Sequence, residues 1–237
     1  MKIFFLLLTL LSTLSQAETS VLFIGNSYTG QIKKTLMQLN KHEGNKIHME
    51  FVTPGGCTLK KHFENQKTLE LLKSRPWTYV VLQEQSQTPA YKDLRPSFLK
   101  ASKQLNKIIS AQGSKTLFYL TWGRRDGDKQ NLKIAPDYTT MQKMLTTAYT
   151  QAAKEANAEL APVGLAWQEV RKTAPELGQQ LYKKDGSHPS AQGAYLASLV
   201  LYCKILDLKA SELSFKASLS NAEIQVIKRA TQHTLED

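Results

Sequence analysis

Short hydrophobic runs alternate along the chain with longer segments in which hydrophobic residues recur every three or four positions. The short runs are rich in β-branched and apolar residues, which is typical of buried strands, and the longer segments have the spacing of amphipathic helices. This alternation predicts parallel strands joined by crossover helices. Trp167, Tyr195 and Tyr202 recur at helical spacing and are expected in the core. The predicted strands are 20–24, 47–53, 77–82, 116–121 and 159–163, and the predicted helices are 31–42, 59–73, 96–111, 138–157, 189–206 and 221–233.

The N-terminus has a different pattern, which predicts a targeting segment. Lys2 supplies a positive charge, residues 3–14 form an apolar run, and Ser15 and Ala17 are small. This order is typical of a secretory signal peptide, with cleavage expected after Ala17. The apolar run is shorter than the ~20 residues that a membrane-spanning helix needs, so a permanent anchor is disfavoured. We therefore expect residues 1–17 to be removed and the mature protein to be secreted or periplasmic.

The rest of the sequence, residues 18–237, has the length of one domain with a full-sized core. The whole chain has a net charge of +11, of which Lys2 contributes one unit. A positive exported protein is attracted to anionic polymers and to envelope surfaces. Nucleic acid is disfavoured as a partner, because the sequence lacks both a basic–aromatic pattern and a known reader motif.

Histidine and cysteine spacing gives no indication of a metal centre. The chain has five histidines and two cysteines, and none of them stands in an HExxH, CxxC or comparable motif. We therefore expect no metal and no other cofactor. In an oxidising compartment, Cys57 and Cys203 either form a disulfide or remain free thiols, and the sequence leaves both alternatives open.

Ser27 lies in the sequence GNSYT, directly after the first predicted strand. A serine on a tight strand-to-helix turn exposes its hydroxyl at the rim of the sheet. Its N–H then lies at a helix N-terminus, where a developing oxyanion is stabilised. The same residue types also form ordinary turns and helix caps. Taken alone, the segment is compatible with either a nucleophile or a cap.

A second motif, DGSHP, begins at Asp185 and precedes the helix predicted at 189–206. Asp185 stands three residues before His188, so its carboxylate can bind one ring nitrogen and leave the other for a serine. The segment is also a plausible plain turn, since Asp-Gly favours turns and Pro189 suits a helix start. Chemistry in such sheets lies at the carboxyl ends of the strands. Together the two motifs predict Ser27 as nucleophile, His188 as base and Asp185 as its partner.

The chain resembles the SGNH (GDSL-like) hydrolase superfamily in these motifs and in their order. GNSYT stands near the mature N-terminus, a glycine-rich turn follows the second strand, and DGSHP stands near the C-terminus. The resemblance spans nearly the whole mature chain. It implies a flavodoxin-like three-layer α/β/α sandwich with a five-stranded, mostly parallel sheet, and hydrolysis of carboxylic esters through an acyl-serine intermediate. The α/β-hydrolases fit less well, because their nucleophile stands in a mid-chain GxSxG motif.

The resemblance also implies three hydrogen-bond donors for the oxyanion. The first two are the N–H groups of Ser27 and of a glycine in the PGGC turn, where Gly56 is predicted because it lies furthest into the turn. The third strand ends in QEQSQ instead of the family's GxND, and this run is similar to the Gln-Gly-Glu block of carbohydrate acetylesterases. Gln83 is therefore the first candidate for the third donor and Gln85 the second, with an ordinary polar loop as the alternative. Glu84 is expected to be an exposed loop carboxylate.

Three further residues follow the fourth predicted strand on the same rim. Trp122 is predicted to hold a sugar face, and Arg124 and Arg125 an anionic substituent, together with Gln85 as a binding residue. A solvated basic loop is the alternative for this segment. The loops PGGCTLKKH, QEQSQTPAYKD and GRRDGDKQ are polar, which favours sugars over lipids.

The function predicted from these features is that of an exported O-acetylesterase acting on an acetylated, anionic (poly)saccharide. A lipid esterase, thioesterase or lysophospholipase on the same scaffold is the alternative enzyme. A non-catalytic binding module is disfavoured, because binding alone does not require Ser27, Asp185 and His188 together.

Overall fold

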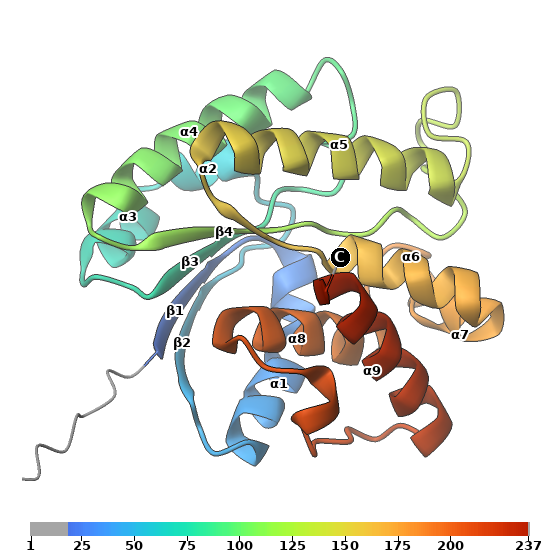
Figure 1. Ribbon diagram of the computed structural model, residues 1–237. Coiled ribbons are helices and arrows are strands. Elements are labelled where there is room, and N and C mark those ends of the chain that lie inside the picture. The colour runs from blue at the N-terminus through green and yellow to red at the C-terminus, as the bar shows by residue number, and fades with distance from the viewer. Residues whose placement is uncertain (1–18, 237) are drawn as a thin grey trace, which may run out of the picture.

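The computed structural model describes residues 19–236. The predicted signal peptide, residues 1–17, and its cleavage site lie outside the described residues. Five strands form one parallel sheet in the order β2-β1-β3-β4-β5 (Figure 1). The strands are β1 (Thr19–Ile24), β2 (Ile47–Val52), β3 (Tyr79–Leu82), β4 (Lys115–Tyr119) and β5 (Glu159–Ala161). The predicted five-stranded parallel sheet is therefore confirmed.

Helices cover both faces of this sheet and complete the predicted three-layer sandwich (Figure 1). The β1–β2 connection and the β3–β4–β5 connections run in opposite directions from the centre of the sheet, so the strand order reverses between β1 and β3. Sites in such sheets lie at this reversal. One face carries α1 (Ser27–His42), α6 (Val163–Thr173), α8 (Ala191–Leu206) and α9 (Asn221–Glu236), and the other carries α2 (Leu59–Phe63), α3 (Gln66–Lys73), α4 (Arg95–Ala111) and α5 (Tyr138–Ala156).

Alternate residues of the central strands enter two separate hydrophobic cores. Val21 and Phe23 of β1 pack against the layer of α1 and α8, whereas Leu22 and Ile24 pack against the layer of α4 and α5. Successive side chains of a strand point to opposite faces, and both faces are covered here, so these strands are hydrophobic at every position. The predicted core position of Trp167, and of the two tyrosines in α8, is confirmed by their complete burial.

The structure differs from the predicted elements in the helices described below, in the added 3-10 turn Ala210–Glu212 and by a few residues at several ends. The helix predicted at 59–73 is two helices, because the side chain of Asn65 accepts a hydrogen bond from the Thr68 N–H (3.0 Å) and starts α3 as an N-cap. The structure also adds α6 and a short helix α7 (Pro175–Gln180), which the sequence analysis does not predict. Buried residues of α6, from Val163 to Val170, recur at helical spacing, so the signal for this helix is present in the sequence.

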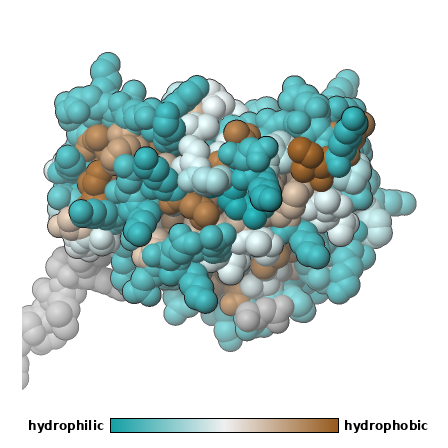
Figure 2. Space-filling model, turned by 90° about the horizontal axis from the view of Figure 1, so that it is seen from above, coloured by the Kyte–Doolittle hydropathy of each residue, from teal (hydrophilic) through white to brown (hydrophobic). Residues whose placement is uncertain are grey.

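The surface over α4 and α5 is mostly hydrophilic, with hydrophobic residues in small separate areas (Figure 2). Large hydrophobic side chains that are about half exposed belong to Met37, Leu94, Leu132 and Ile134. None of the helices between residues 19 and 236 is long and apolar enough to cross a membrane.

Candidate active site

The turn between β1 and α1 places Ser27 at the first position of the helix. Asn26 is the N-cap, and its side-chain oxygen accepts a hydrogen bond from the Tyr28 N–H (3.1 Å). The Asn26 amide also donates to the Cys57 carbonyl (3.0 Å), which ties this turn to the turn after β2. Gly25 has no room for a side chain, because a Cβ there would lie 2.6 Å from Gln83 Oε1. The serine therefore sits on a tightly held strand-to-helix turn.

Ser27, His188 and Asp185 are joined by hydrogen bonds. Ser27 Oγ lies 2.9 Å from His188 Nε2, and His188 Nδ1 lies 2.6 Å from Asp185 Oδ2. The second carboxylate oxygen accepts the N–H groups of Ser187 (2.9 Å) and of His188 (3.0 Å). Partial burial raises the pKa of Asp185, but these hydrogen bonds and the adjacent imidazole outweigh it and hold the pKa below its usual range. The carboxylate therefore stays ionised next to the ring.

This geometry can activate a hydroxyl group. Asp185 binds one ring nitrogen, which leaves the other nitrogen of His188 to accept the Ser27 proton. The Ser27 N–H is the first of α1, so it has no acceptor inside the helix.

The loop that carries Asp185 and His188 is closed at its base by backbone hydrogen bonds. The Ser190 N–H donates to the Leu181 carbonyl (2.9 Å), and the Lys183 N–H donates to the His188 carbonyl (2.8 Å). Between them, Gly186 has a φ of +67°, a left-handed conformation that glycine adopts without strain. Its carbonyl accepts the Arg125 N–H (2.8 Å), which joins the loop to the segment after β4.

Beneath this loop lies a stack of aromatic rings, and Trp122 is in the middle of it. The Trp122 ring is stacked on Tyr28 (4.9 Å between centroids) and on Trp167 (3.9 Å). Its indole N–H donates to the Ser187 carbonyl (2.9 Å), and the Tyr28 hydroxyl is 2.6 Å from Ser187 Oγ. The edge of His188 packs against Tyr28. Trp122 is completely buried, so the prediction that it holds a sugar face is wrong; it supports the histidine loop instead.

Gln83 also lies below the surface. Its Oε1 accepts the Asn26 N–H (3.0 Å) and the Thr29 hydroxyl (2.9 Å), and its amide N–H donates to the Glu84 carbonyl. The side chain is completely buried, so it cannot reach a substrate oxygen. The structure therefore corrects the prediction of Gln83 as third oxyanion donor: this glutamine holds the nucleophile turn from below.

The predicted second donor, Gly56, lies in an exposed turn that is tied to the Ser27 turn through Asn26 and Cys57. The Cys57 N–H donates to the Pro54 carbonyl (3.2 Å), and Gly56 has a φ of +64°. Within the described residues, the Gly56 N–H has no hydrogen-bond acceptor, and it is available to a ligand. The oxyanion role of the Ser27 and Gly56 N–H groups stays a prediction.

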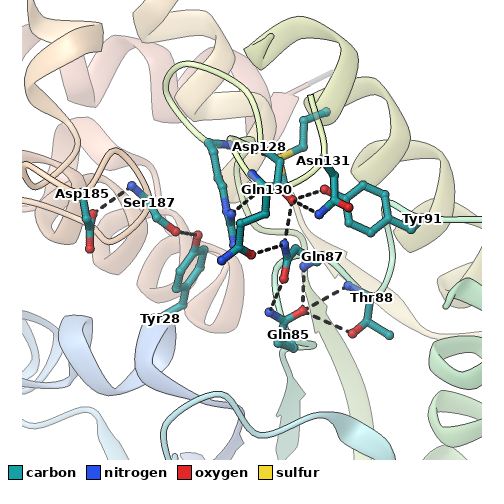
Figure 3. Close-up of polar contacts among 12 residues, drawn as sticks. Tyr28, Gln85, Gln87, Thr88, Tyr91, Asp128, Gln130, Asn131, Asp185 and Ser187 are labelled. Carbon is teal, nitrogen blue, oxygen red and sulfur yellow. Dashed lines mark hydrogen bonds and ion pairs between the residues drawn. The ribbon is translucent and has the colours of Figure 1, made fainter. Parts of the chain in front are cut away.

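On the other side of the rim, hydrogen bonds to and from the Gln85 side chain hold the loop after β3 in shape (Figure 3). Gln85 Oε1 accepts the N–H groups of Gln87 (2.8 Å) and Thr88 (3.2 Å), and its amide donates to Gln87 Oε1 (3.2 Å). The Gln87 amide donates to Asp128 Oδ2 (2.7 Å) in the loop after β4. The structure thus gives Gln85 a role in shaping the loop, and its predicted contact with substrate stays a prediction.

Asp128 is the centre of a network that joins these two loops (Figure 3). It is completely buried and accepts hydrogen bonds from Arg124 Nη1 (2.5 Å), Asn131 Nδ2 (3.0 Å) and the Tyr91 hydroxyl. Burial raises the pKa of Asp128. The hydrogen bonds to its carboxylate and the Arg124 charge have the larger, opposite effect and lower the pKa to about 2. The sequence alone did not single out Asp128. The available signal is the spacing of four positions between Arg124 and Asp128, two residues of opposite charge in one polar loop.

Each of the two predicted anion-binding arginines is paired with an aspartate. The Arg124 side chain, 19% exposed, binds the buried Asp128, and Arg125 Nη2 lies 3.0 Å from Asp126 Oδ2. Neither guanidinium therefore presents an uncompensated positive charge. This corrects the interpretation of the Arg124–Arg125 pair as a binding element for an anionic substituent.

Glu84 is buried rather than exposed, contrary to the expectation from its loop. It is 1% exposed, and its carboxylate accepts the N–H groups of Gln85 (2.7 Å) and Leu59 (3.2 Å). Burial raises the pKa of Glu84 to about 7, although both N–H groups act in the opposite direction. No basic side chain of the described chain forms an ion pair with it. The carboxyl group connects β3 to the start of α2.

Cys57 and Cys203 are both free thiols in the structure. Cys57 is partly exposed in the turn after β2, whereas Cys203 is buried in α8. Of the two alternatives left open by the sequence, the structure has the unpaired one. Within residues 19–236, no group of three or more His, Cys, Asp or Glu side chains is arranged to hold a metal ion.

No protein-family model matches the chain. No curated protein matches it. Solved structures do match. A protein of the DUF4886 family from Bacteroides uniformis has a TM-score of 0.78 and 19% sequence identity over 92% of this chain and 95% of its own. A proposed SGNH hydrolase from Slackia heliotrinireducens has a TM-score of 0.65 and 28% identity over 77% of this chain and 96% of its own. An acetyl xylan esterase has a TM-score of 0.62 and 14% identity over 78% of this chain and 98% of its own.

The chain therefore has the fold of the SGNH hydrolases, and the resemblance stated from its motifs is confirmed. Neighbours that are named by activity include esterases, in agreement with the predicted class of carboxylic ester hydrolase.

Proposed function

We propose that the chain is an exported serine esterase that removes short acyl groups, above all acetyl, from a polysaccharide. The observation that carries the proposal is the hydrogen-bonded series from Ser27 through His188 to Asp185, at 2.9 and 2.6 Å. A serine hydroxyl is a weak nucleophile at neutral pH unless a base takes its proton. The series supplies that base and fixes its tautomer.

The reaction has two halves. Ser27 Oγ attacks the ester carbonyl carbon while its proton passes to Nε2 of His188, and the oxyanion receives the N–H groups of Ser27 and Gly56. His188 then gives the proton to the leaving alcohol, and an acyl-serine remains. In the second half, His188 takes a proton from water, the hydroxide attacks the acyl-serine, and the carboxylic acid leaves as Ser27 regains its proton.

The preference for a sugar substrate rests on the polar rim. The loop after β3 carries the polar side chains of Gln85, Gln87 and Thr88. Such groups hydrogen-bond hydroxyls better than they bind acyl chains. Each methylene of a longer acyl chain that is left unburied forgoes about 0.8 kcal/mol. The acetyl xylan esterase among the structural neighbours agrees with this preference.

Export and an anionic substrate are the other parts of the proposal. The signal-peptide pattern of residues 1–17 supports export, and the net charge of +11 supports an anionic polymer. Arg124 and Arg125 are neutralised by aspartates, so the contacts to such a polymer must lie elsewhere on the molecule.

The proposed chemistry is tested by covalent labelling with a fluorophosphonate. We expect the reagent to label Ser27 and the label to be lost in Ser27→Ala and in His188→Ala. Asp185→Asn should keep the fold and lower kcat by about 10²–10⁴. Ser110→Ala, at the exposed end of α4, is the matched control and should be labelled like the wild type. Labelling of another serine in Ser27→Ala would refute the assignment.

A panel of p-nitrophenyl esters from C2 to C12 tests the acyl preference. The expected result is the highest kcat/KM for acetate. A higher value for octanoate than for acetate would favour a lipid esterase instead.

A further inference from the structure

A groove of about 690 Å³ runs along α1, between this helix and the edge strand β2. Its lining includes Lys33, Lys34 and Lys41 from the helix, and apolar side chains such as Met37 and Met49. None of its lining residues is acidic. A neighbouring hollow shares Lys34 and Lys41, adds Lys216, and has no acidic residue in its lining either. The two hollows together form a positively charged surface, which we call the lysine groove.

The lysine groove begins beside the catalytic turn. Gly30, one helical turn after Ser27, lines the end of the groove that is nearest to Ser27. It lies against Thr53, because a Cβ on this glycine would be 3.3 Å from the threonine hydroxyl. Thr53 leads directly into the turn that contains Gly56. At ~1.5 Å of rise per residue, Lys34 and Lys41 stand about 10 and 21 Å from Ser27 along the helix axis. A chain lying in the groove can therefore reach the nucleophile at one end.

The charges of this groove are not compensated locally. Lys34 and Lys41 form no ion pair with any described residue, and the Lys33 ammonium lies 5.0 Å from the ring centroid of Phe51. Glu43 and Glu50 stand close to the lining residues in the sequence, and each is bonded to a group other than these lysines. Glu43 accepts the N–H groups of two residues after the 3-10 turn Ala210–Glu212, and Glu50 binds His48 (3.2 Å). Three unpaired lysines over an apolar floor match a ligand that has anionic groups and apolar faces.

We propose that the lysine groove binds the carboxylate-bearing backbone of an acetylated acidic polysaccharide and leads one of its acetyl esters to Ser27. This inference rests on the proposed esterase function and adds the surface that binds the polymer and the carboxylates by which it is recognised. Sugar rings have apolar C–H faces for the methionines and carboxylates for the lysines. A membrane surface fits less well, because the lysines and the apolar side chains line a hollow. Nucleic acid also fits less well, because Phe215 is the single Phe, Tyr or Trp among the described residues that line the two hollows, and successive bases need a series of such rings on which to stack.

The test compares two triple variants of equal charge. Lys33→Gln/Lys34→Gln/Lys41→Gln alters the groove, and Lys103→Gln/Lys107→Gln/Lys143→Gln alters exposed lysines of α4 and α5 in the opposite layer. The substrates are O-acetylated polygalacturonate, neutral acetylated xylo-oligosaccharides and p-nitrophenyl acetate. For the groove variant we expect about a tenfold rise in KM on polygalacturonate, from three exposed charge contacts, and changes below about twofold on the two neutral esters. The control variant should stay within about threefold on all three.

Salt gives a second readout. The difference in KM between the wild type and the groove variant on the acidic polymer should disappear at about 0.5 M salt, because the Debye length then falls to a few ångströms. Hydrolysis of p-nitrophenyl acetate should hardly change. The proposal would be overturned if KM on polygalacturonate rose equally in the groove and control variants, or if it rose in neither.

Binding of an unacetylated polymer tests the groove independently of the esterase function. Ser27→Ala should bind unacetylated polygalacturonate in calorimetry, and the same protein with the groove substitutions should bind it about tenfold more weakly. This result would support the groove even if no ester were hydrolysed. If the groove substitutions weaken binding to phosphatidylglycerol vesicles but leave polygalacturonate binding unchanged, the groove serves a membrane surface and the proposal is wrong.

Discussion

On the side of His188, the rim of the candidate site is supported by stacked rings, whereas on the side of Gln87 it is supported by hydrogen bonds to one buried carboxylate. Tyr28 and Trp122 support the histidine loop through ring contacts and two hydrogen bonds to Ser187. Asp128 joins the loops after β3 and β4 by accepting hydrogen bonds from side chains of both. The two sides lie on the same sheet edge but depend on different interactions.

The difference lies in how each support responds to the loss of one part. A ring in a stack contributes about 0.5–1.5 kcal/mol beyond its buried area, and its neighbours can partly close around a smaller ring. A buried polar network has no such tolerance, because removing one charge leaves the others desolvated and unpaired. We therefore expect the polar side to be the more sensitive of the two to single substitutions.

The largest effect is expected for Asp128→Asn. This change leaves the mostly buried Arg124 guanidinium without its counter-charge and should lower the free energy of unfolding by about 3–5 kcal/mol. The matched control is Asp126→Asn, whose carboxylate pairs with Arg125 near the surface and is 47% exposed. The Asp126→Asn substitution should lower the free energy of unfolding by less than about 1 kcal/mol. Urea denaturation measures both, and equal small losses would show that the Asp128 network is not the main support.

Glu84 is the other buried carboxyl group on the polar side, and it lacks a cation. The folded protein keeps the Glu84 proton up to a pKa of about 7, whereas the unfolded chain loses it near 4.5. The folded state thus binds more protons in this range, and stability should fall as the pH rises from about 4.5 to 7. Glu84→Gln should remove a fall of about 3 kcal/mol, at 1.36 kcal/mol per pKa unit. Urea denaturation at pH 5 and pH 8 measures the difference, and identical pH dependence in both proteins would contradict the assignment.

A smaller effect is expected on the aromatic side. Trp122→Phe keeps a ring in the stack but removes the hydrogen bond to the Ser187 carbonyl, which should cost about 1 kcal/mol of stability. Because Ser187 stands between Asp185 and His188, kcat should fall several-fold with little change in KM. The control is Trp167→Phe, because the Trp167 indole N–H forms no hydrogen bond to the histidine loop in the described chain. Steady-state kinetics on p-nitrophenyl acetate should show the fall in kcat for the first variant alone, and equal kcat values would mean that this hydrogen bond does not position the loop.

The sequence predicted those parts of the site whose chemistry is local. Ser27, Asp185 and His188 stand on two short loops, and the strand pattern alone brings those loops to one edge of the sheet. Whether the side chain of Gln83 points out to a ligand or inward depends on Asn26 and Thr29, which are more than fifty positions away in the chain. The residue type therefore indicated a donor but not the direction of its amide.

The same limit explains the other differences. Trp122 follows a strand, where an exposed sugar platform would also stand, but Tyr28 of α1 and Trp167 of α6 stack on its ring and bury it. Cys57 and Cys203 can pair only if the fold brings them together, and spacing along the chain does not determine that distance. The sheet could be predicted without knowing such distances. Both faces of its central strands are covered, so these strands are hydrophobic at successive positions, and their composition alone identifies them.

The position of Gln83 has a consequence for the speed of the proposed reaction. One carbonyl oxygen binds both the Asn26 N–H and the Thr29 hydroxyl, so the turn is held by a residue on each side of Ser27 before any substrate arrives. Donors that are fixed in advance need not reorient when negative charge develops, which lowers the reorganisation part of the activation barrier. The ordering of this turn takes place once, when the chain folds, and not in every catalytic cycle.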